Sequence, residues 1–297
     1  MKGRHAAAAA LLTAGILWLY SGVLSSLVRQ WASDDNYSHG FLIVPVALFC
    51  AWERREVLRR LERRPHGGGL VIVLLSLIVF AMGVLAAELF LTRISLVGVV
   101  AGAVLFVWGT GHVRALAFPL ALLPLMVPLP AILFNQIALP LQLIASRVGE
   151  ATIAAFGIPV LRDGNILELP AMTLAVAEAC SGIRSLISLV TLAIVLAYFA
   201  GRGAWGRAVV VASAVPIAIA ANAARVAGTG LTAHWIGRSA AEGFFHGFSG
   251  WLLFLTAFAA LVGVQAVANR LPPWRRRRGA PEARVEERLE ERCSPAR

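Results

Sequence analysis

Long apolar runs are the feature of this sequence that most limits the folds open to it. Several approach the roughly 20 residues that a helix needs to cross a hydrocarbon core of about 30 Å. Charged residues make up only 14% of the chain, against about a quarter in soluble domains. We therefore predict an all-α polytopic integral membrane protein with about eight transmembrane helices. The expected spans are about Ala6–Val28, Phe41–Trp52, Leu70–Ala87, Ile94–Trp108, Ala115–Leu133, Ile183–Ala200, Ala208–Gly228 and Phe248–Ala268.

Three stretches depart from this simple pattern. The first run has no convincing cleavage site and is expected to remain as an uncleaved span. The fifth run holds four prolines, which predict a kinked or unwound outer half. Gln136–Phe156 is amphipathic and is expected to lie along the membrane interface.

Gly157–Ala179 differs from the apolar runs around it. Its sequence IPVLRDGNILELP alternates loosely around Asp163-Gly164, which is a hairpin signal. We predict a small extracytoplasmic extended or β-hairpin element that leads the chain to Cys180.

Basic residues predict the orientation of the chain. Six arginines fall in Glu53–His66, and further ones follow the last span. With both termini and the even-numbered turns in the cytoplasm, about 20 of the 27 basic residues lie inside, as the positive-inside rule requires. The net charge of +11 is then explained by topology, so membrane lipid is the expected partner and nucleic acid is not. We expect a transmembrane domain over residues 1–270 and a cytoplasmic Arg/Glu-rich tail over 271–297.

The stretch VAEACSGIRSL surrounds Cys180, where an extended segment turns into an apolar run. A thiol in the first turn of a helix is shifted toward the nucleophilic thiolate. Arg184 would favour the thiolate, Glu178 would oppose it, and Ser181 and Gly182 follow directly. Alone, the pattern also fits a small cysteine packed at a helix start.

The predicted topology places further polar side chains on the same outer face as Cys180. Arg225 lies within the apolar seventh span, about a turn from its end. An arginine at the centre of such a span costs roughly 2.5–3.5 kcal/mol on membrane-insertion scales. Asn222 shares its helical face, and His246 and His39 begin the eighth and second spans. Arg225 could stabilise an oxyanion, and a neutral His246 could act as a base. The alternatives are that Arg225 snorkels to the interface and that His246 is an ordinary interface residue.

The cysteines show no spacing that indicates a disulfide framework or a metal site. Cys50 falls in an apolar run and Cys293 in the charged tail. No metal and no cofactor are predicted.

Four motifs together resemble the exosortase/archaeosortase family of membrane cysteine transpeptidases. They appear in family order over roughly residues 10 to 270, and each alone is weak. They are YSHGFLIVP from Tyr37, EACSGIRSL around Cys180, NAAR from Asn222 to Arg225, and HGFSGW from His246.

The resemblance implies Cys180 as nucleophile, Arg225 as transition-state stabiliser and His246 as acid/base partner. Supporting residues would be Asn222, Glu178, Ser181, Gly182, Arg184 and His39, although His39 is equally explained as a helix-start residue. The substrates implied are exported proteins with a C-terminal PEP-type sorting signal, cut at the outer face of a bacterial inner membrane and passed to a surface acceptor. An association with exopolysaccharide is also implied. A transporter, or an envelope-assembly scaffold without peptidase activity, is the alternative, and no oligomeric state is predicted.

Overall fold

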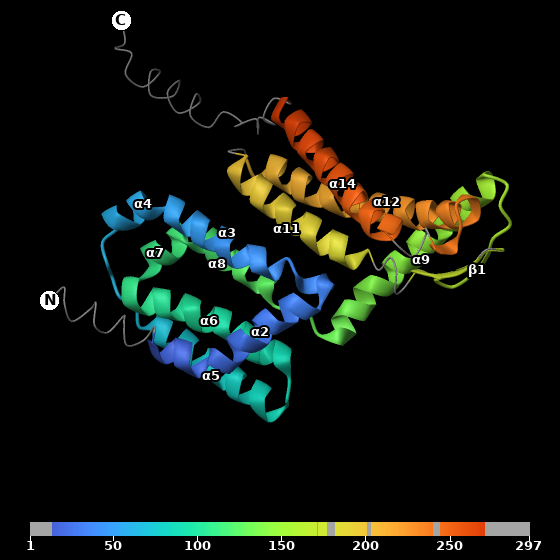
Figure 1. Cartoon of the computed structure of the whole chain (residues 1–297). Helices are drawn as coiled ribbons and strands as arrows, with labels where there is room; N and C mark the ends of the chain where they lie inside the picture. The colour runs from blue at the N-terminus through green and yellow to red at the C-terminus, as the bar shows by residue number, and fades with distance from the viewer. Residues whose placement is uncertain (1–13, 171, 177–181, 201–202, 240–243, 271–297) are drawn as a thin grey trace, which may run out of the picture. The chain divides into compact units, whose positions relative to one another are not determined.

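The computed structural model describes residues 14–170, 172–176, 182–200, 203–239 and 244–270, and in the last helix not the side chains of 244–247 and 249. The described chain is almost entirely helical and forms two compact units (Figure 1). Unit 1 comprises residues 1–144 and 175–184, and unit 2 comprises 145–174 and 185–297. The predicted tail 271–297 lies outside the described residues.

Unit 1 begins with helices that follow the predicted spans but shift their ends. Helix α2 (Ser21–Ser33) continues past Val28, the expected end of the first span. It ends where Asp34 caps the short 3-10 helix η1 (Asp35–Tyr37), accepting a hydrogen bond from the backbone N–H of Asn36. Helix α3 (Gly40–Glu53) matches the second predicted span and is followed by α4 (Arg55–Arg60).

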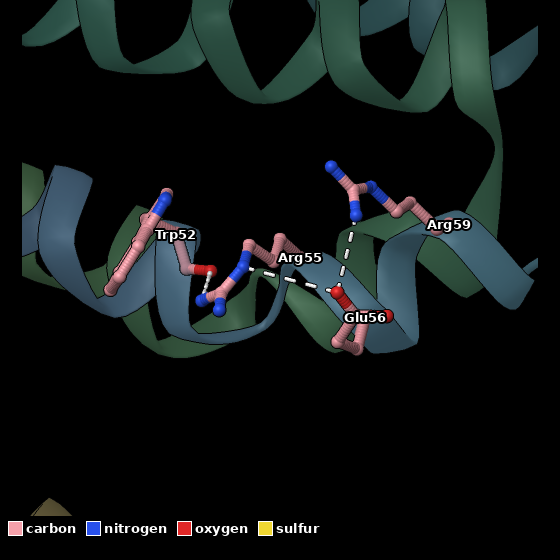
Figure 2. Close-up of polar contacts among 4 residues, drawn as sticks. All are labelled: Trp52, Arg55, Glu56 and Arg59. Carbon is pink, nitrogen blue, oxygen red and sulfur yellow. Dashed lines mark hydrogen bonds and ion pairs between the residues drawn. The ribbon is translucent and has the colours of Figure 1, made fainter.

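The polar junction between α3 and α4 has the chemistry of a membrane–water boundary (Figure 2). The Arg55 guanidinium lies 4.0 Å above the Trp52 ring, and its Nη1 donates to the Trp52 carbonyl. Arg59 Nη1 lies 3.2 Å from Glu56 Oε1. Because these side chains are exposed, the ion pairs add little stability, but a tryptophan beside arginines is typical of a helix end at the lipid headgroups.

Helices α5 (Gly68–Leu85) and α6 (Leu89–Trp108) form an antiparallel hairpin held together by small residues (Figure 1). Gly83 faces Thr92, Ser76 faces Gly98, and Gly69 faces the backbone of Gly102, so contacts advance along one helix as they retreat along the other. Helix α6 starts five residues before the predicted Ile94, because the Glu88 carboxylate caps its first turn.

The fifth predicted span is not a continuous helix. Helices α7 (Thr110–Ala115) and α8 (Ala117–Leu122) lead into the 3-10 helix η2 (Leu123–Met126), and an extended segment follows. The prolines explain this break, because each lacks the N–H that an α-helix needs. Helix α9 (Ala131–Ala155) then begins before Gln136 and is long and apolar enough to cross a membrane, although we predicted an interfacial helix here.

In unit 2 a small sheet packs against the second half of α9. Strands β1 (Leu161–Asp163) and β2 (Ile166–Glu168) pair antiparallel in the segment for which the sequence predicts a hairpin, and β3 (Thr173–Ala175) follows in the order β1-β2-β3. Ser146 on α9 donates to the Gly164 carbonyl, and Arg162 forms a 2.8 Å ion pair with Glu150. These contacts attach the sheet to the second half of α9.

Helices α11 (Ile183–Phe199), α12 (Ala204–Trp235) and α14 (Phe244–Arg270) form the core of unit 2. Alanines dominate their contacts, which lets the helices approach closely without the hydrophobic driving force that water provides. The buried residues are Leu189, Ala193 and Ala197 of α11, Val210, Ala214 and Ala218 of α12, and Ala257 and Leu261 of α14.

The described residues support fewer spans than the eight that we predict. Within the described residues, five helices are long and apolar enough to cross a membrane, rather than eight. The predicted first span lies partly outside these residues, the second and sixth are helices of 14 and 17 residues, and the fifth is broken by prolines. The all-α, multi-pass character of the chain is confirmed.

Candidate active site

Arg225 lies in the interior of helix α12 and not near its end. The helix continues to Trp235, ten residues or about 15 Å further than Arg225, whereas the sequence predicts an end near Gly228. No proline or charged residue interrupts the helix in these ten residues, which explains the extension. The Arg225 side chain is half-buried, and Asn222, one turn earlier, is 6% exposed.

The guanidinium of Arg225 packs against a glycine of the neighbouring helix α14. A Cβ atom placed on Gly250 would lie 3.0 Å from Nη2 and 3.1 Å from Cζ of Arg225. His246 stands in the first turn of α14, one helical turn before Gly250. The two helices thus bring Arg225 to the level of the turn that follows His246.

A small cavity opens between α11, α12 and α14 beside this arginine. Asn222, Arg225, Gly250 and Ser185 line it, and the space open to the centre of a water molecule is about 10 Å³, room for about one water. Three of these residues carry hydrogen-bonding side chains, so the cavity is a polar spot within an apolar helix bundle.

The nucleophile candidate lies outside the described residues, together with Glu178 and Ser181. The chain is described again at Gly182, which is buried and has a φ of +63°, a conformation that favours glycine. Helix α11 begins one residue later, at Ile183. Arg184, which we expected to favour a thiolate at the helix start, has a carboxylate partner elsewhere. Its Nη2 forms a 3.1 Å ion pair with Asp35 of η1.

His39 occupies the N-cap position of α3 in unit 1. Its Nε2 lies 3.2 Å from the Leu125 carbonyl, so this nitrogen carries a proton and donates to η2. Burial lowers the pKa of His39, and the nearby backbone carbonyls act in the opposite direction to a smaller extent. The contact shows what His39 does for the fold, namely to connect α3 to η2.

A comparison with protein families matches residues 31–263 to the transmembrane exosortases, which is most of the chain. This protein belongs to the transmembrane exosortase family. The match includes Cys180, Arg225 and His246. Neither curated proteins nor solved structures give a match. Membership suggests a membrane sorting transpeptidase, a class that generally uses a cysteine.

Sequence reasoning missed two residues that line the cavity beside Arg225. Ser185 was passed over because it follows Arg184 as an ordinary helix residue, and Gly250 because its role depends on α12. The spacing of Gly250 from His246, one helical turn, is a signal that would have linked the two.

Proposed function

We propose that this exosortase is a membrane-embedded cysteine transpeptidase that cleaves a PEP-type C-terminal sorting signal at the outer membrane surface and transfers the exported protein to a surface acceptor. The observation that carries the proposal is the packing of the Arg225 guanidinium against Gly250, one turn from His246 and beside Asn222. A fixed cation in a polar spot within an apolar helix bundle suits an oxyanion that forms only in the transition state.

The mechanism follows from these side chains. His246 takes the proton of the Cys180 thiol, and the resulting thiolate attacks a peptide carbonyl. The oxygen that becomes negative is stabilised by Arg225, with Asn222 as a second donor. His246 gives its proton to the leaving amine as the C–N bond breaks, which leaves a thioester on Cys180. An acceptor amine or water then attacks the thioester, gives a proton to His246 and releases the thiolate.

Co-expression with a reporter that carries such a signal tests this proposal. Wild-type protein should shorten the reporter on a blot, and Cys180→Ala, Arg225→Ala and His246→Ala should abolish this at unchanged protein levels. Cys50→Ala and Cys293→Ala are matched controls that remove the other two thiols and should process normally. Full processing by Cys180→Ala would exclude the mechanism and leave a transporter or scaffold as the better explanation.

Hydroxylamine distinguishes a thioester from direct hydrolysis. Added outside the cells, it should intercept the acyl group and convert the released reporter into its hydroxamate, because an amine nucleophile resolves a thioester faster than water does. A reporter cleaved without hydroxamate formation would exclude transfer through a thioester that is open to the outside.

A further inference from the structure

A strongly basic surface lies at one end of unit 1, apart from the residues that the mechanism uses. Residues 53–64, which include α4, hold six arginines and only three glutamates. Helix α7 packs against α4 and adds one more arginine (Figure 1). We call this the basic surface, and its arginines are Arg54, Arg55, Arg59, Arg60, Arg63, Arg64 and Arg114.

The glutamates of the basic surface neutralise only some of its arginines. Glu56 and Glu62 pair with three of them, and Figure 2 shows the pairs that Glu56 forms. In the part of the chain that the structure describes, no carboxylate forms an ion pair with Arg60, Arg63 or Arg114. All three are exposed, and because a guanidinium is always protonated, they are available to bind anions.

Packing between α4 and α7 brings these arginines together from two separate segments. A Cβ placed on Gly111 would lie 3.7 Å from Leu61, and Arg114 follows Gly111 by about one helical turn. The backbone N–H of Arg64 donates to the Trp108 carbonyl over 3.3 Å, which holds the segment after α4 beside the start of α7. The positive-inside rule explains on which side of a membrane arginines lie, but it does not require segments far apart in the sequence to bring them together.

Exposed apolar side chains border the basic surface. The ring of Trp52 is 58% exposed and lies under the Arg55 guanidinium, and Phe49 is 52% exposed with its ring centroid 6.2 Å from that of Trp52. Val57 of α4 is exposed as well. Aromatic rings beside arginines are typical of the level of the lipid headgroups. This combination fits a ligand with an anionic head and an apolar tail.

We propose that the basic surface binds the headgroups of anionic phospholipids, whose phosphates contact Arg60, Arg63 and Arg114 and whose acyl chains lie along Phe49 and Trp52. A guanidinium presents parallel N–H donors that match the oxygens of a phosphate. A zwitterionic lipid offers the same oxygens, but its cationic group is repelled by the arginines, so the surface selects lipids with a net negative charge. The proposal does not depend on the proposed function, because it uses no residue of the reaction.

A binding experiment on the full-length protein in uncharged detergent micelles tests this. The probes are phosphatidylglycerol and phosphatidylcholine with the same fluorescent acyl chain, and binding is measured by energy transfer from the tryptophans. We expect phosphatidylglycerol to bind at least about 10-fold more tightly at low salt. Raising NaCl from about 0.05 M to about 0.5 M should reduce this preference to about twofold or less, because exposed charges are screened. Equal binding of the two lipids, or a preference that salt does not change, overturns the proposal.

A triple variant locates the site. Arginines near an anionic membrane surface contribute about fivefold each to affinity, so three together contribute up to about 100-fold. Replacement of all three should therefore make the affinities for the two lipids equal, and an unchanged preference would contradict the site. The substitutions are Arg60→Gln, Arg63→Gln and Arg114→Gln.

A matched control separates a site from attraction by net charge. It removes the same charge from exposed arginines on three other helices, with Arg147→Gln on α9, Arg207→Gln on α12 and Arg270→Gln on α14. The control should keep the preference for phosphatidylglycerol to within about threefold, because screening weakens charges that lie far from the lipid. Equal losses in the two triple variants would show attraction by net charge alone and would overturn the site.

Glycerol 1-phosphate distinguishes a lipid from a soluble phosphate compound, because it carries the phosphate without acyl chains. At millimolar concentration it should not displace phosphatidylglycerol from wild-type protein. Displacement would show that the arginines bind soluble phosphate compounds and would overturn the assignment to lipid.

Discussion

The position of the Arg225 guanidinium depends on Gly250, a residue without a side chain. Gly250 leaves room for the guanidinium against helix α14, and any Cβ there would stand 3.0 Å from Nη2, closer than side chains normally approach. The arginine can move away from such an atom because it is the flexible end of a long side chain. We therefore expect substitutions of Gly250 to change the position of the charge more than the stability of the fold.

Gly250→Ala should lower reporter processing about tenfold or more, since a misplaced oxyanion donor loses most of its effect. Its melting temperature should not fall, because alanine in a helix interior is more stable than glycine by about 0.5–1 kcal/mol. Gly263→Ala on the same helix is the control, as no atom lies within 4 Å of the added Cβ. Normal processing by Gly250→Ala would show that the arginine does not need its present position.

His39 makes the stability of unit 1 depend on pH. Because burial lowers its pKa, the unfolded chain takes up the proton first as the pH falls through the ordinary value of about 6.5. The folded state thus loses stability below that pH and keeps it above.

The variant His39→Gln retains a hydrogen-bond donor for the Leu125 carbonyl. Its melting temperature should fall less than that of wild type when the pH is lowered from 7.5 to 5.5. The exposed His66, changed to Gln, should behave as wild type. The same pH dependence in His39→Gln and wild type would contradict this assignment.

At the scale of elements, the α5–α6 hairpin is held by glycines at its backbone contacts. A Cβ on Gly69 would meet the backbone N of Phe106 and would lie 2.6 Å from the Gly102 carbonyl oxygen. Backbone atoms cannot turn aside as a side chain can, so the whole helix would have to shift.

Gly69→Ala should therefore destabilise the protein by about 1–3 kcal/mol, as overpacking does elsewhere. Gly67→Ala, two residues earlier, is the matched control because its Cβ would meet no atom within 4 Å. Thermal melts in detergent would compare the two, and equal melting temperatures would show that the helices separate at no cost.

Elements that depend on the local sequence could be predicted, whereas features that depend on contacts between distant residues could not. Apolar runs predicted most helices, because length and hydropathy are local properties, and the turn at Asp163-Gly164 signalled the hairpin. Helix ends were missed wherever a cap or a neighbour decided them, as at Glu88 for α6. Arg93 was missed for the same reason, since only the fold shows that its partners are Gln30 and Ser26.

At the scale of the whole molecule, the arginine distribution predicts which end of each unit faces the cytoplasm. In a background with Cys50, Cys180 and Cys293 replaced by alanine, Leu161→Cys should react with a membrane-impermeant maleimide in intact cells. Leu161 is 65% exposed and stands in β1. Arg63→Cys should react only after permeabilisation, and the opposite pattern would invert the topology.

The order of the two units along the chain has a consequence for biogenesis. Unit 1 is complete once residue 184 has been made, but the last helix, which carries Gly250, belongs to unit 2. The ribosome adds about 5–20 residues per second. Gly250, which packs against Arg225, is therefore added several seconds after residue 184. If the proposed mechanism holds, a nascent chain cannot cleave peptides until this last helix has been made, because the cavity beside Arg225 has no wall from α14 before then.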